Sequence, residues 1–151
     1  MRTALLTALL AGLVGAGLLA QTGSVRGPAA AAADLRPIGT MRELMAFVIR
    51  PASDAVFYIT SRTPESGEAW LALQGQALAL AEAGTILMLP AHARGRAQWL
   101  ADARLMREAG RKAFAAAKAK DVAALEALND ELYTSCTTCH ERMKVKVGGA
   151  D

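Results

Sequence analysis

The two cysteines of this chain lie close together, in the sequence Cys136-Thr137-Thr138-Cys139-His140. Two residues between the thiols, and a histidine directly after the second, form the C-x-x-C-H pattern of covalent haem attachment. The spacing suits that chemistry, because both thiols can bond to the vinyl-derived carbons along one edge of the macrocycle while His140 points at the iron from the same side. The motif predicts one haem c, attached through Cys136 and Cys139, with His140 as the proximal iron ligand.

Three other uses of a cysteine pair compete with haem attachment. A thiol–disulfide centre of the thioredoxin type requires a βαβ context. A zinc site is one ligand short, and His92 would have to complete it from a distant connection, where we expect this histidine to be exposed. The third use is a plain structural disulfide. Each of these alternatives predicts a colourless protein even after maturation in a haem-competent host.

The composition favours an all-α fold for the elements that position the motif. The chain has 151 residues, enough for one domain. It contains 34 alanines and 20 leucines, which lose little side-chain freedom on entering a helix. Valine and isoleucine runs of the kind that a parallel sheet buries are lacking. The net charge of +3 is small and no basic stripe interleaves with aromatics, so we expect no nucleic-acid partner.

Four stretches of the chain place apolar residues at steps of three and four, the spacing of an amphipathic helix. They cover roughly residues 40–61, 63–90 and 93–119, and a stretch from 121 through the motif. Thr40, Thr63 (followed by proline) and Asp121 are the expected N-caps, and Pro51 is expected to kink or restart the first helix. Four such segments with short connections predict an antiparallel four-helix bundle, with haem near the C-terminal helix.

The N-terminus has the pattern of a secretory signal peptide, because Arg2 precedes a long run of leucine, alanine and glycine. Export places the protein in the bacterial periplasm, where c-type haem is attached. The cleavage site stays open and could lie as late as residue 33, and an uncleaved leader would act as a membrane anchor. The expected division is a leader at 1–20, a flexible tether at 21–37, the folded domain at 38–147 and a tail at 148–151.

A C-x-x-C-H motif on the last helix of an all-α exported chain resembles the class II c-type cytochromes, the cytochrome c-prime group and its low-spin, methionine-ligated relatives. The resemblance covers roughly residues 38–146, and the first helix, Thr40-Met41-Arg42-Glu43-Leu44-Met45, carries its second part. It implies that this helix packs over the distal haem face, where low-spin members place a methionine as sixth iron ligand. It also implies that an arginine of this helix, here Arg42, meets a haem propionate.

Met41 and Met45 compete for the place of the distal ligand, since residues four apart share a helix face. We expect Met45 to bind iron because it lies a full turn into the helix, whereas ordinary core packing is the alternative for both. The chain departs from the family at Met143 and Lys144, where members commonly carry an aromatic residue and an arginine. A lysine offers a propionate a point charge without a bidentate fork.

The resemblance implies an electron carrier with His140 and Met45 as axial ligands and with transient redox protein partners. Without a methionine ligand it implies a five-coordinate, high-spin haem that binds NO or CO, with Leu44 or Val48 crowding the open side. Family members are often dimers through the first two helices, so a homodimer is possible here. The sequence lacks a nucleophile elbow and a phosphate-binding glycine loop, and we expect no enzyme.

Overall fold

The computed structural model describes residues 35–93 and 96–144. The predicted leader at 1–20 and tail at 148–151 lie outside the described residues. Within the described ranges the chain is helical and contains no strand, which confirms the all-α class. None of the helices in these ranges is both long enough and apolar enough to cross a membrane.

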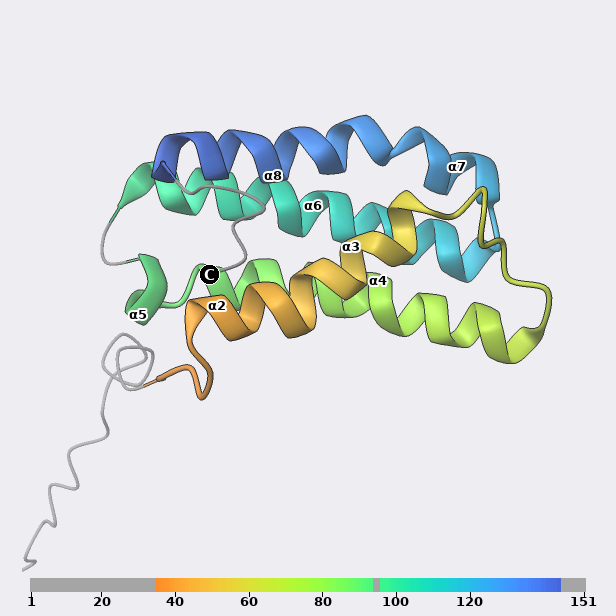
Figure 1. Ribbon diagram of the computed structural model, residues 1–151, viewed down its shortest axis with the longest axis horizontal. Coiled ribbons are helices and arrows are strands. Elements are labelled where there is room, and N and C mark those ends of the chain that lie inside the picture. The colour runs from red at the N-terminus through yellow and green to blue at the C-terminus, as the bar shows by residue number, and fades with distance from the viewer. Residues whose placement is uncertain (1–34, 94–95, 145–151) are drawn as a thin grey trace, which may run out of the picture.

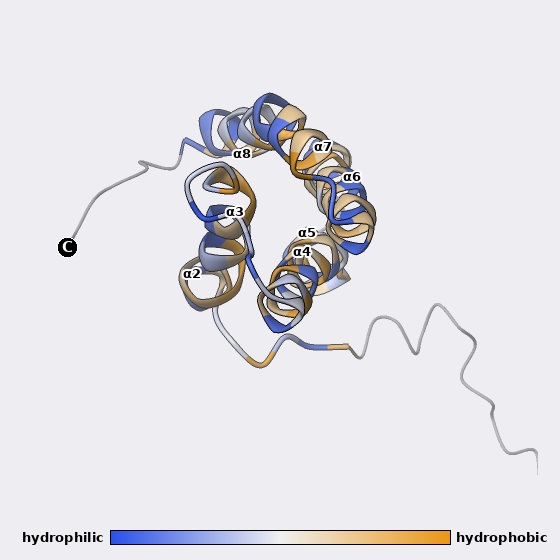
Figure 2. Ribbon diagram, turned by 90° about the vertical axis from the view of Figure 1, so that its right-hand side faces the viewer, coloured by the Kyte–Doolittle hydropathy of each residue, from blue (hydrophilic) through white to orange (hydrophobic). Residues whose placement is uncertain are grey.

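The elements follow one another as long rods joined by short connections (Figure 1). In chain order they are α2 (Met41–Leu44), η1 (Met45–Ile49), α3 (Arg50–Phe57), α4 (Gly67–Leu87), α5 (Pro90–Ala93), α6 (Ala97–Ala119), α7 (Val122–Ala127) and α8 (Asn129–Met143). The first three join end to end and are called the first helix below. Viewed along the rods, the first helix, α4, α6 and the α7–α8 pair surround a common interior (Figure 2).

The first helix begins where the sequence predicts. Thr40 is its N-cap and forms a capping box, in which the Thr40 hydroxyl accepts from the Glu43 amide at 3.2 Å and the Glu43 carboxylate accepts from the Thr40 amide at 2.7 Å. The expected restart at Pro51 is confirmed, because the α-helix is interrupted and resumes at Arg50 as α3, with the proline in its first turn. The interruption is η1, a wider π-helical turn over Met45–Ile49. Such a turn relieves the clash between a proline ring and the carbonyl four residues earlier.

The second helix starts later than predicted. The Thr63 hydroxyl donates to the Ile59 carbonyl at 2.9 Å, so it serves the end of the preceding element and caps no new helix. Ser66 caps α4 instead, and its hydroxyl accepts from the Ala69 amide at 3.1 Å.

The third helix, α6, starts at Ala97, later than predicted, and the short α5 lies in the connection before it. The fourth predicted helix is divided. It begins at its predicted N-cap, Asp121, whose carboxylate accepts from the Ala124 amide at 2.9 Å. A turn at Leu128 then separates α7 from α8.

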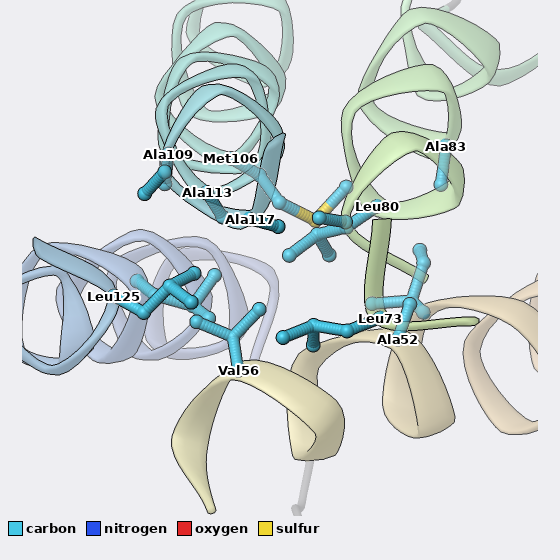
Figure 3. Packing of buried hydrophobic residues seen from close by; sticks show 14 of the residues in the cluster. Ala52, Val56, Leu73, Leu80, Ala83, Met106, Ala109, Ala113, Ala117 and Leu125 are labelled. Carbon is cyan, nitrogen blue, oxygen red and sulfur yellow. The ribbon is translucent and has the colours of Figure 1, made fainter. Parts of the chain in front are cut away.

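Alanine-rich faces form most of the core, and they allow the rods to approach closely. The buried side chains of α4 and α6 interlock with those of the first helix and α7 (Figure 3). Val56, Leu80, Leu125 and Leu132 are fully enclosed. The antiparallel order of α6 and α8 follows from the Lys112–Glu131 and Asp102–Arg142 ion pairs, in which residue numbers rise along one helix as they fall along the other.

Candidate cofactor site

A cavity of about 790 Å³ lies between the first helix, α6 and α8. Its volume falls in the range of cofactor pockets, about 300–1,000 Å³. The five site residues predicted from the sequence all line it: Arg42, Met45, Cys136, Cys139 and His140. A second hollow of about 800 Å³ lies between α3 and the start of α4 and contains none of them. The fold therefore brings together residues almost a hundred positions apart in the sequence.

One wall of the cavity is the C-terminal part of α8. Buried Leu132 holds this helix in the core, and the Ser135 hydroxyl donates to the Leu132 carbonyl at 2.7 Å, which satisfies a buried polar group without leaving the helix. Cys136, Cys139 and His140 follow on the half-buried face.

Both cysteines are free thiols, and their surroundings favour the protonated form. Burial raises the pKa of the Cys136 thiol, although a hydrogen bond with Ser135 opposes the shift. Burial also raises the pKa of the Cys139 thiol, and the nearby Asp102 carboxylate adds to this effect. Reactive redox cysteines have lowered pKa values, so these thiols lack the electrostatic setting of a thioredoxin-type centre.

The zinc alternative gains no support from the described part of the chain, where no three His, Cys, Asp or Glu side chains gather as a metal-ligand set. His92 lies in α5 and is half-buried, so the expectation of an exposed histidine is wrong. This histidine packs where the chain turns from α4 into α6.

A second wall of the cavity is the first helix. Met41 and Met45 both line the cavity and are half-buried, while Arg42 and Arg50 line it from exposed positions. Both methionines thus line the same cavity as the cysteines and histidine of the motif.

The apolar residues expected to crowd an open distal side lie elsewhere. Neither Leu44 nor Val48 lines the cavity, and that expectation is wrong. Ala46 and Ile49 line it instead.

The π-helical turn explains how one face of the first helix lines the cavity over its whole length. Five residues at steps of four line it: Met41, Met45, Ile49, Ser53 and Phe57. At 3.6 residues per turn each step of four drifts by about 40°, so an α-helix would spread these positions over about 160°. A π-helical turn takes up one extra residue, which reduces the spread to about 60° on the same geometry.

The third wall contains a residue that sequence reasoning missed. Asp102 of α6 is 1% exposed and lines the cavity. Its Oδ1 atom accepts from Gln98 Nε2 at 3.1 Å and from the Arg142 guanidinium, while its Oδ2 atom is buried with no hydrogen-bond partner. The available signal was an acidic residue on the apolar face of α6, three positions after Trp99 and four before Met106.

The end of α8 differs from the expectation about Lys144. Lys144 is exposed and does not line the cavity, whereas Met143 does. The guanidinium of Arg96 lies 3.6 Å from the Met143 sulfur and stacks 4.5 Å over the ring of Trp99. The indole N–H of Trp99 donates to the Leu87 carbonyl at 2.6 Å, which fixes this corner of the cavity.

Comparisons of the chain with protein-family models, with curated proteins and with solved structures gave no match. The function of the site is therefore inferred from its own residues.

Proposed function

We propose that this protein is an exported c-type cytochrome that carries electrons, built as an antiparallel four-helix bundle around one covalently bound haem. The observation that carries the proposal is the single cavity that has Cys136, Cys139 and His140 on one wall and Met45 on the other. Two thiols, an imidazole and a thioether are the donor set of a methionine-ligated c-type haem. The largely apolar lining and the volume of about 790 Å³ suit a flat macrocycle.

Each cavity residue would have a separate role toward the haem. Cys136 and Cys139 attach the haem through thioether bonds, His140 is the proximal iron ligand and Met45 the distal one. When bound, the haem supplies one-electron redox chemistry. The apolar wall residues exclude water from the iron and keep the potential high, to which the thioether ligand contributes.

Arginines on the rim of the cavity complete the donor set. Arg42 and Arg50 line the cavity from exposed positions two turns apart on the first helix. Planar guanidinium groups are well suited to the carboxylates of haem propionates. In this role Arg42 has a neighbour of the same charge, and Lys144 is not needed. Electron exchange then needs only brief contacts with redox protein partners, and the chain is not itself an enzyme.

The alternative is a five-coordinate, high-spin haem that binds NO or CO. The specific observation in its favour is that Met41 and Met45 belong to one apolar stripe with Ile49, as methionines packed in a core would. The two functions differ only in whether a methionine sulfur binds iron.

Absorption spectra of protein matured in a periplasm competent for c-type haem distinguish the two functions. The electron carrier requires a low-spin spectrum that CO does not change, and Met45→Ala should convert it to a high-spin, CO-binding form. Met88→Ala is the matched control, because Met88 caps α4 and does not line the cavity. A high-spin spectrum in the unaltered protein supports gas binding, conversion by Met41→Ala alone transfers the distal role to Met41, and the absence of haem absorbance refutes both functions.

A further inference from the structure

Asp102 is the only acidic residue among the described residues that line the cavity. It is 1% exposed and lies in the second turn of an alanine-rich helix that supplies much of the core. Burial of a carboxylate is costly unless its oxygens are paired. A residue of this kind in a cofactor cavity therefore calls for an explanation beyond packing.

The two oxygens of Asp102 have different surroundings. Oδ1 accepts from Gln98 Nε2 at 3.1 Å and from the guanidinium of Arg142, so it is fixed from both α6 and α8. Oδ2 has no hydrogen-bond partner in the described structure and no solvent contact. The carboxylate is thus held in place through one oxygen, and its charge is enclosed in the wall of the cavity.

The position of this charge relative to the motif follows from its neighbours on α8. Asp102 and Cys139 line the same cavity. Arg142, its ion-pair partner, comes two residues after His140 in the same helix. The Arg142 side chain is 46% exposed, whereas that of Asp102 is fully buried. Water screens the positive partner more than the negative one, so this ion pair contributes a net negative field to its wall of the cavity.

We propose that Asp102 sets the reduction potential of the bound haem by stabilising its oxidised form. This inference rests on the proposed function. Reduction adds one electron, delivered by a protein redox partner, to the ferric iron and gives the ferrous iron, so the bound group loses one positive charge. A fixed carboxylate stabilises the more positive, oxidised state and lowers the potential. The positive charge of Arg142 favours the reduced form and raises the potential, but this effect is weaker because solvent screens the exposed guanidinium.

Two variants that break the same ion pair separate this role from a structural one. Asp102→Asn removes the negative charge with almost no change in shape, and should favour reduction by about tenfold in the equilibrium constant. Arg142→Gln leaves the carboxylate without its cation, and should disfavour reduction by about threefold, because its charge is better screened. Potentiometric titration of the purified, haem-loaded variants measures both effects.

If the ion pair is purely structural, the reduction potentials of Asp102→Asn and Arg142→Gln should shift in the same direction or stay unchanged. Either result would overturn the inference. Asp102→Glu keeps the charge and should stay close to the wild-type potential. If Asp102→Asn does not accumulate, Arg142→Gln still tests the inference, because an unchanged or raised potential in that variant overturns it. A wild type without haem absorbance overturns the proposed function and this inference with it, whereas a loaded wild type with unmoved potentials overturns the inference only.

Discussion

The contact between α4 and α6 depends on two glycines, and replacing one of them gives a prediction that the structure makes quantitative. A Cβ atom on Gly110 would lie 2.6 Å from the Ala81 amide nitrogen and 2.8 Å from its Cα atom. A Cβ atom on Gly84 would lie 2.7 Å from the Arg107 Cβ atom. Because backbone atoms cannot rotate away as a side chain can, the two helices would have to separate along their whole contact.

The expected cost of Gly110→Ala combines two opposing effects. Alanine is favoured over glycine inside a helix by about 1 kcal/mol. Overpacking a core costs about 1–3 kcal/mol, and a clash with backbone belongs at the upper end. The variant should therefore lose about 2 kcal/mol in free energy of unfolding, as the difference of those effects.

Urea unfolding followed by far-UV circular dichroism measures this loss. Gly75→Ala is the matched control, because Gly75 lies in α4 with nothing within 4 Å of the added Cβ atom, so the same substitution should stabilise by about 0.5–1 kcal/mol. If Gly110→Ala were as stable as Gly75→Ala, the two helices would not be in backbone contact and the reasoning would fail.

Two further predictions concern the cavity walls. Trp99→Phe leaves the buried Leu87 carbonyl without its donor and should cost about 1–3 kcal/mol in urea unfolding; an unchanged midpoint would mean that this hydrogen bond is not formed. Burial raises the pKa values of the Cys136 and Cys139 thiols in the folded protein. Their ordinary pKa is about 9.0, so above that pH the unfolded chain loses these protons before the folded protein does. The free energy of unfolding of the haem-free protein should therefore fall as the pH rises from about 9.0 through the higher pKa values of the folded state. A variant with both cysteines replaced by alanine should lack that part of the pH dependence, and an unchanged slope would contradict the prediction.

Local patterns predicted the helices well where a single interaction decides their ends. Thr40 and Asp121 cap helices as expected, because the side-chain oxygen of each accepts from the backbone amide three residues later. Thr63 does not cap a helix, because its hydroxyl donates a hydrogen bond to the Ile59 carbonyl instead. At Pro51 the α-helix restarts as the sequence predicts, but the pattern does not show that the preceding turn widens into a π-helical one.

The cavity residues were predictable because their helices show clear apolar stripes. The motif and Met45 lie on stripes that face the interior of the protein, although their roles toward haem remain predictions. Asp102 was not found, since an aspartate on a helix is ordinarily solvated. Its ion pair with Arg142 joins residues forty positions apart, and only the tertiary structure shows that contact.

The π-helical turn also allows the first helix to lose one residue without rotating its two ends relative to each other, which α4 and α6 cannot do. Residues on either side of η1 keep the directions they would have in an uninterrupted α-helix one residue shorter, and the turn presents Phe47 to solvent at 74% exposure. Loss of one residue there would straighten the turn without rotating Met41 relative to Phe57. A single deletion inside α4 or α6 would turn every following side chain by about 100° out of the core. The wall that carries the candidate distal ligand is thus the one part of the described core whose chain length can vary without loss of register.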